Sequence, residues 1–329
     1  MAVTALNRTP PEAGGPARRA LVVSIINYKT ADLTLACIAS VLPEIDGIDA
    51  EIVVVDNLSG DGSAETIEAW IAARPDPCPV RLVRSATNSG FSGGHNQGMG
   101  ACPAEAVLVL NSDAVLRPGC IKALLDAMAA EPEIGLFAPQ LEYEDGEVQT
   151  SCFRFHGPTS ELIRGAATGP LTRVFRRRDV PLDMPPAREN IEWASFACIL
   201  LRGQMVREIG PMDEGYFLYY EDSEYCLRAR RAGWRIAYVP KARVVHYRGG
   251  SAPVKTLARA RKRLPRYYYA SRTRFLRQAH GYPGYLAANV LWYLGRGIQL
   301  VRRTAPPVEA EGRDIWIGAM TPLDQPAPR

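Results

Sequence analysis

The sequence predicts an α/β protein built on a doubly wound, mostly parallel sheet. Short apolar runs rich in β-branched residues alternate with segments whose apolar residues recur at helical spacing, from residue 20 to about residue 130. Polar residues follow the end of each apolar run. Because ligands bind at the carboxyl ends of strands in such sheets, this order also predicts a binding site at one sheet edge.

The elements follow one another in a regular order. ALVVSIINY (20–28) and AEIVVVDN (50–57) are typical of strands buried on both faces, and TADLTLACIASVL between them has helical spacing. DGSAETIEAWIAA predicts a second helix, and VRLVRSA and AVLVLNSDAVL predict two more strands. PGCIKALLDAMAAEP predicts a helix that stops at a proline. Such alternation is that of βαβ units.

Composition limits the class of protein. The 329 residues are 47% hydrophobic and 22% charged, which is ordinary for a globular protein. Seven scattered cysteines without a CxxC pair favour reduced thiols in the cytosol, and residues 1–19 lack the apolar region of a signal peptide. No apolar run approaches the roughly 20 residues that a membrane span needs.

The net charge of +4 conceals an asymmetry. Residues 225–308 contain no Asp or Glu, yet 19 of the 39 Lys and Arg fall there. Such a block predicts an anionic partner: a diphosphate, an acidic lipid or a nucleic acid.

The segment SATNSGFSGGHNQGMG (85–100) has five glycines between two apolar runs. A plain connection needs only one or two. Since glycine lets backbone approach a ligand closely, we interpret the segment as a loop that holds a ligand at the sheet edge.

Two carboxylates end predicted strands. Asp56 in VVVDN can accept from the N3–H of a uracil or thymine ring, and Asp113 in VLVLNSD can hold Mg²⁺ or Mn²⁺ against a diphosphate. For each, capping of the next turn or helix is the structural alternative.

A third group of acids starts a predicted helix. YYEDSEYCLRARRAGW places Glu221, Asp222 and Glu224 after aromatic residues. A carboxylate beside a second one has a raised pKa, which suits a general base, while favourable interaction with the helix dipole is the structural alternative. His246 ends a strand before glycines, and for a single histidine a packing role is the alternative. No G-x-G-x-x-G, Walker A or HExxH motif is present, which disfavours a dehydrogenase or kinase.

Taken in order, six segments between residues 20 and 251 resemble the rhamnosyltransferase-like branch of family 2 glycosyltransferases, which have the GT-A fold. They read VVSIINY, VVVDNLSGDGS, NSGFSGGHNQG, LNSDA, GPMDEGYFLYYEDSEYCLRARRAG and HYRGGS. The joint order is far more specific than any one of the motifs.

The resemblance implies a role for each matching residue. Asn27 and Asp56 would line the base pocket, and Asn88, Gly90 and Asn96 would contact ribose and diphosphate. Asp113 matches the second acid of the DxD metal motif, and His246 matches a position that assists the metal, Mg²⁺ or Mn²⁺. Asp222 matches the catalytic base of the ED motif, with Trp193 and Glu221 on the acceptor side.

Two positions depart from the family pattern. Asn111 stands where the wider GT-A group has the first acid of DxD, which leaves strict metal dependence open. Phe196-Ala197 stands where the family often has Gly-Ala, and the bulky ring changes the donor-sugar or acceptor pocket.

The resemblance also divides the chain: a flexible lead (1–19), a GT-A catalytic domain (20–253) with a nucleotide-binding half (20–140) and an acceptor half (141–253), a basic helical region (254–305) and a flexible tail (306–329). Because the region 254–305 combines Arg with Tyr and Trp, we expect it to rest on anionic lipid. Packing on the catalytic domain is the alternative.

The implied function is that of an inverting glycosyltransferase in cell-envelope polysaccharide synthesis, peripheral on the cytoplasmic face of the cell membrane. Its donor would be a nucleotide-sugar, with dTDP-rhamnose favoured, and its acceptor a polyprenyl-diphosphate-linked or other glycan. The alternatives are a UDP-hexose-dependent transferase and, from a different class, a non-catalytic glycan- or nucleic-acid-binding protein; intact Asp113 and Asp222 argue against the latter. We expect no nucleic-acid partner, and the sequence leaves a homodimer open.

Overall fold

A computed structural model describes residues 18–247, 254–302 and 308–326. Of the predicted flexible lead (1–19), residues 1–17 lie outside the described residues, and Arg19 already belongs to the first strand. The larger sheet has eight strands in the order β3–β2–β1–β4–β9–β6–β10–β5, and β7 and β8 pair separately. The strands are β1 (Arg19–Asn27), β2 (Ala50–Asp56), β3 (Val80–Arg84), β4 (Ala104–Asn111), β5 (Ala114–Leu116), β6 (Ile134–Glu142), β7 (Cys152–Phe153), β8 (Trp193–Ala194), β9 (Cys198–Arg202) and β10 (Arg235–His246).

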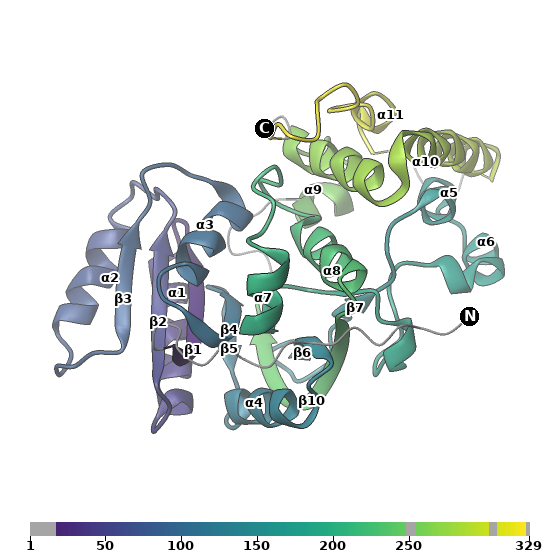
Figure 1. The fold of residues 1–329 in the computed structure, drawn as a ribbon. Coiled ribbons are helices and arrows are strands. Elements are labelled where there is room, and N and C mark those ends of the chain that lie inside the picture. Colours follow the sequence, from purple (N-terminus) through teal and green to yellow (C-terminus); the bar gives the residue numbers. More distant parts are fainter. Residues whose placement is uncertain (1–17, 248–253, 303–307, 327–329) are drawn as a thin grey trace.

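The helices cover both faces of this sheet and extend beyond one end of it (Figure 1). They are α1 (Ala31–Val41), α2 (Ser63–Ala72), α3 (Gly90–Met99), α4 (Cys120–Ala130), α5 (Pro158–Ala166), α6 (Gly169–Val174), α7 (Gly203–Ile209), α8 (Glu221–Arg231), α9 (Val254–Arg259), α10 (Arg266–Arg302) and α11 (Glu311–Asp314).

The sheet is mixed, and its parallel part has the predicted alternation. β3, β2, β1 and β4 pair in parallel, and so do β6 and β10. β9 runs antiparallel between β4 and β6, and β5 runs antiparallel at the edge beside β10. The prediction of a doubly wound, mostly parallel sheet flanked by helices is confirmed.

Successive side chains of the central strands pack alternately into two separate hydrophobic cores, one on each face of the sheet. Leu21, Val23 and Ile25 of β1 join Ile38 of α1 and Leu124 of α4 in the first core. The intervening Val22 joins the second core, which contains side chains from α3, α7 and α8. Both faces of the strands are therefore buried, as their continuous apolar runs require.

The glycine-rich segment differs from the prediction, because most of it is helix α3 and not a loop. A Cβ at Gly98 would lie 2.1 Å from Ser24 Oγ, and one at Gly94 would lie 2.7 Å from Ile26 Cδ1. The glycines at these two positions therefore let the helix lie directly on β1. A cavity is lined by the start of the segment, at Asn88, Gly90 and Phe91, and by His95 on α3.

The C-terminal region packs against the rest of the protein. α10 is two helical segments joined at Gly281, whose φ of 69° breaks the helix before Pro283. α5 and α11 lie beside α10 (Figure 1). The predicted flexible tail is ordered in its described part, where α11 forms and Ile315 is fully buried. Among the described helices, none is both long and apolar enough to cross a bilayer.

Candidate active site

A cavity of about 380 Å³ lies at the carboxyl ends of the central strands. Its walls come from the ends of β1, β4 and β10, the start of α3, the segment before β9, the loop before α8 and the start of α10. The polar side chains around it include Asn57, Asn88, His95, Asn111, Ser112, Asp113, Ser195, Glu221, Asp222 and His246. Its size is within the range of small-molecule binding sites.

Antiparallel pairing brings Asp113 and His246 together. β5 turns back beside β10, so that His246 is paired with Ala114, and the Tyr247 N–H donates to the Asp113 carbonyl oxygen at 3.0 Å. His246 Nε2 and Asp113 Oδ1 then lie 3.5 Å apart, and both side chains are largely buried. Within the described residues, His246 Nδ1 has no hydrogen-bond partner.

This pair fits a divalent cation whose other ligands come from a diphosphate and water. The residues described here contain no group of three or more His, Cys, Asp and Glu that could hold a metal alone. A site with one carboxylate is nevertheless usual when phosphate oxygens complete the coordination. The imidazole nitrogen favours a transition metal such as Mn²⁺ over Mg²⁺, which takes oxygen ligands.

Two acids face the same cavity from the start of α8. Tyr219 and Tyr220 just before it have φ values of 71° and 69°, which non-glycine residues adopt rarely and which cluster at functional sites. The helix then begins with Glu221 and Asp222, both of which line the cavity.

Burial raises the pKa values of both acids. Desolvation, together with the neighbouring Asp222, raises the pKa of Glu221 well above its ordinary value. Burial also raises the pKa of Asp222, to about 6, although N–H donors from Ser223 and Phe196 oppose the shift. With a pKa of about 6, Asp222 is ionised near pH 7, and a carboxylate of this basicity suits a general base.

The loop that carries these acids is attached to α3 on one side. Asn96 accepts from the Met212 N–H at 2.8 Å and donates to the Met212 carbonyl at 2.9 Å. The Phe91 N–H donates to the Phe217 carbonyl at 2.7 Å. Gly90, with a φ of 72°, allows this contact, since a Cβ there would lie 2.0 Å from the Phe217 carbonyl oxygen.

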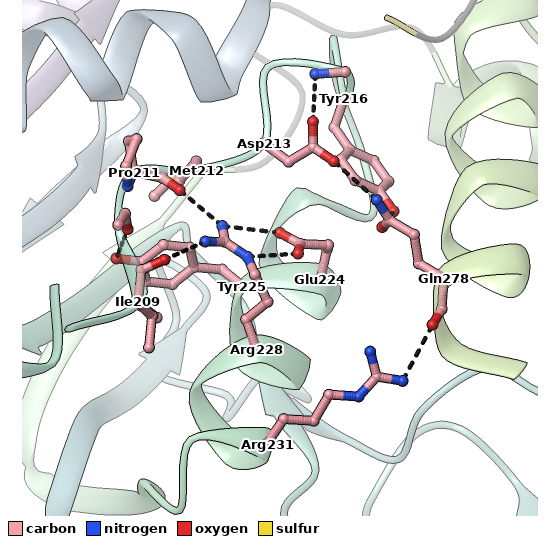
Figure 2. A network of polar contacts seen from close by, with 12 residues as sticks. Ile209, Pro211, Met212, Asp213, Tyr216, Glu224, Tyr225, Arg228, Arg231 and Gln278 are labelled. Atoms are coloured by element: carbon pink, nitrogen blue, oxygen red, sulfur yellow. Dashed lines mark hydrogen bonds and ion pairs between the residues drawn. The ribbon is translucent and has the colours of Figure 1, made fainter. Parts of the chain in front are cut away.

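On its other side the loop is attached to α10. Arg274 is buried and donates twice to Asp213, at 3.0 Å in each case. Gln278 donates to the same carboxylate at 3.0 Å and accepts from the Tyr216 hydroxyl at 2.5 Å (Figure 2). α10 therefore takes part in positioning the loop that leads to Glu221 and Asp222.

A third set of contacts ties α8 to the start of this loop. Arg228 pairs with Glu224 on its own helix and donates to the carbonyls of Ile209 and Pro211 (Figure 2). Glu224 is thus part of a structural ion pair, as one of the alternatives for the acid cluster predicted.

Several predicted site residues do not line this cavity. Asn27 donates to Asp56 at 2.7 Å, and Ser59 occupies both oxygens of the Asp56 carboxylate. Asn96 forms the link to Met212 described above. Trp193 stacks on Phe153 with ring centroids 4.1 Å apart. The cavity does bring together Asn88, Gly90, Asp113, Glu221, Asp222 and His246.

Other lining residues were not predicted. Asn57 donates to the Gly90 carbonyl at 2.9 Å and accepts from the Ser89 N–H at 3.1 Å, so it fixes the start of α3. Its position next to Asp56 at a strand end was the available signal. The aromatic wall of Phe217, Tyr219 and Tyr267 joins two distant segments, and the sequence carries no signal for that contact. Phe196 was expected to change the pocket, and it does line the cavity, where it packs edge-on against Tyr225.

Comparisons with known proteins agree on one family. The profile "Glycosyl transferase family 2" matches residues 22–171, and "Glycosyl transferase family group 2" matches residues 106–304. An N-acetylglucosaminyl-diphospho-decaprenol L-rhamnosyltransferase of Mycobacterium tuberculosis is 31% identical over 220 residues, which cover 61% of this chain and 67% of that protein.

Two solved structures share the fold. A mannosyltransferase from Pyrobaculum calidifontis, in complex with GDP-Man and Mn²⁺, has a TM-score of 0.53 at 15% identity and covers 89% of this chain and 78% of its own. GalNAc-T7 with UDP, GalNAc and Mn²⁺ has a TM-score of 0.60 at 14% identity, and the match covers 93% of this chain and 58% of the GalNAc-T7 chain. At these identities the likeness shows the fold, and it confirms the GT-A prediction.

Proposed function

Because the chain belongs to glycosyl transferase family 2 and is a glycosyltransferase, we propose that it moves a sugar from a nucleoside diphosphate to a hydroxyl of a lipid-linked glycan, with inversion at the anomeric carbon. The observation that carries this proposal is that Asp113 and Asp222, from distant parts of the chain, line one cavity. We propose dTDP-rhamnose as the donor, since the Mycobacterium tuberculosis relative is named a rhamnosyltransferase.

The donor would lie along the strand ends. Asn57 and Asn88 offer polar groups near the start of α3, and the diphosphate would lie toward Asp113 and His246. A divalent cation held by this pair supplies positive charge against the diphosphate. The buried, unpartnered Nδ1 of His246 is a further polar atom near this end, among the described residues.

Asp222 would accept the proton of the acceptor hydroxyl. The electron pair left on the acceptor oxygen then forms a bond to the anomeric carbon, from the face opposite the diphosphate. At the same time the bond between that carbon and the diphosphate oxygen breaks, and the nucleoside diphosphate leaves with its electrons. One displacement of this kind inverts the anomeric centre, and its transition state has oxocarbenium character. A pKa of about 6 keeps Asp222 ionised at neutral pH yet basic enough to take a proton.

The acceptor would enter past the aromatic wall. Phe217, Tyr219 and Tyr267 provide apolar ring surfaces on which a sugar can stack. An N-acetylglucosaminyl-diphospho-polyprenol is the acceptor class that the relative's name suggests. We place the reaction in cell-envelope glycan synthesis, on the inner face of the membrane.

The test is release of nucleoside diphosphate from dTDP-rhamnose with this acceptor and Mn²⁺. Wild type should release dTDP and form a rhamnosylated product of inverted configuration. Thermal shifts with dTDP, UDP and GDP identify the nucleotide, and a shift with UDP alone would replace the donor by a UDP-hexose. Failure to turn over any nucleotide-sugar would leave a binding protein and reject the proposal.

A further inference from the structure

The second segment of α10 has an inverted polarity pattern. Every exposed residue from 282 to 301 is apolar or a tyrosine, whereas the buried residues include Asn289 and Gln299. The exposed large apolar side chains recur at helical spacing and form one continuous face, which we call the α10 stripe: Tyr282, Leu286, Val290, Tyr293, Leu294, Ile298, Leu300 and Val301. A surface helix normally presents its polar side to water.

The opposite face of this segment is already used. A Cβ at Gly165 would lie 2.4 Å from the Trp292 carbonyl oxygen, and one at Gly295 would lie 2.4 Å from the Leu162 carbonyl oxygen. The two glycines therefore let α5 and α10 pack backbone to backbone. Since one face is fixed in this way, the stripe cannot turn inward to bury itself.

The stripe also borders an exposed aromatic residue, Trp316, which follows α11. Trp316 donates from Nε1 to the Tyr293 hydroxyl at 3.1 Å, and Tyr293 in turn donates to the Gly312 carbonyl at 2.6 Å. The rings of Trp316 and Tyr293 thus lie at one border of the stripe with their polar atoms paired. Trp and Tyr are the residues enriched at the boundary between acyl chains and head groups.

Charge distinguishes between two occupants of this surface. The only charged residues from 281 to 302 are Arg296 and Arg302, and the sequence has no acid between residues 225 and 308. In an isologous dimer each copy would bring the same arginines to the interface with no acid from this segment to pair with them. An anionic lipid surface complements both the apolar face and its arginines.

We propose that the α10 stripe docks on an anionic bilayer and lies in its interface plane. This inference rests on the proposed function, because it would keep a lipid-linked acceptor beside the cavity: the first segment of the same helix begins at Arg266, and its Tyr267 lines the cavity. One end of α10 therefore contributes to the site while its other half contacts lipid.

The test uses the full-length protein and vesicles without donor or acceptor. Val290, Leu294 and Val301 are 56%, 57% and 87% exposed, so a triple variant with Val290→Ser, Leu294→Ser and Val301→Ser should fold. The matched control is Val174→Ser on α6, where the side chain is 77% exposed. Co-sedimentation is measured with phosphatidylcholine vesicles that contain or lack about 30% phosphatidylglycerol.

We expect wild type and Val174→Ser to bind the anionic vesicles, with an affinity that falls as the salt concentration rises. The triple variant should bind at least about tenfold more weakly than wild type. Equal binding by wild type and the triple variant, or no binding by wild type, would overturn the proposal. A wild-type dimer in sedimentation velocity that the triple variant abolishes would assign the stripe to a second copy instead.

Nucleotide binding separates this proposal from the proposed function. Thermal shifts with dTDP are measured on the same preparations, and turnover is measured with a water-soluble acceptor. Vesicle binding without any nucleotide response would leave the docking surface intact and reject the donor assignment. Full turnover on the soluble acceptor by a wild-type protein that does not bind vesicles would reject the docking proposal and leave the proposed function intact.

Discussion

Replacing Asp222 by Asn should have opposite effects on turnover and on stability. The substitution removes the proton acceptor, so kcat should fall by about 10²–10⁴. It also removes a buried charge from a site that disfavours one. Since burial raises the pKa from 3.8 to about 6, ionising this carboxylate in the folded protein costs about 3 kcal/mol more than in the unfolded chain.

The sign of the stability effect depends on pH. A carboxyl group whose folded pKa is raised contributes its full stability below the unfolded pKa and loses it as pH rises through the folded pKa. Above about pH 7, the free energy of unfolding of wild type is therefore lowered by the whole cost of ionising Asp222. Near pH 4 it is lowered by little of that cost. The Asn side chain can still accept from the Ser223 N–H, so the helix start should survive.

Two measurements check this reasoning on the same preparations. Nucleoside diphosphate release by wild type should fall tenfold per pH unit below about pH 6. Urea unfolding at about pH 8 should show the Asp222→Asn variant more stable by up to about 3 kcal/mol, and the difference should nearly vanish near pH 4.

Glu221→Gln is the matched control. Because burial raises the pKa of Glu221 well above its ordinary value, the neutral amide resembles the acid form that burial favours, and it should leave the acid limb of the rate profile near that of wild type. An Asp222→Asn variant with wild-type turnover would show that Asp222 is not the base. A variant less stable than wild type at about pH 8 would show that its carboxylate is chiefly a structural part of the helix start.

The remaining predictions concern the loop and the metal. Gly90→Ala should destabilise the protein by about 3 kcal/mol or more in urea unfolding, because its Cβ would overlap the Phe217 carbonyl, whereas Gly119→Ala meets no atom within 4 Å and should cost only its backbone strain. Arg274→Met should lower the free energy of unfolding by about 2 kcal/mol or more, because it removes the partner of Asp213. It should also lower kcat by a larger factor than it changes KM, and an unaltered kcat would exclude a positioning role. Asp113→Asn should shift the Mn²⁺ dependence of turnover to higher concentration, which titration of chelator-treated enzyme measures; an unchanged dependence would place the metal elsewhere.

The sheet could be predicted because its signal is local. Continuous apolar runs such as that of β1 identify strands buried on both faces, and the parallel connections follow from the helices between them. The glycine-rich segment was misinterpreted for a physical reason. Glycine serves close packing as well as ligand approach, and which of the two applies at Gly94 and Gly98 depends on Ile26 and Ser24, across the interface with β1.

The site was predictable where a residue ends a strand or starts a helix. Asp113 and Asp222 are of this kind, and both line the cavity. The proximity of Asp113 and His246 depends on the antiparallel pairing of β5 with β10, which the sequence alone does not specify. Asp56 shows the limit of this rule, because a carboxylate at a strand end can accept hydrogen bonds from the turn that follows it. The Ser59 N–H and hydroxyl donate to the Asp56 carboxylate in this way.

The two contacts of α10 have a common consequence for catalysis. Arg274 and Gln278 hold Asp213 in the loop that leads to α8 and Asp222, while the other half of the same helix carries the exposed stripe. We therefore expect docking of the stripe to affect the loop before Asp222, across the helix break at Gly281. If the stripe docks on lipid as proposed, vesicles should raise kcat on the soluble acceptor in wild type and not in Arg274→Met, even though that variant keeps the whole stripe. Equal stimulation of both proteins would show that docking only concentrates the enzyme and that Arg274 transmits nothing.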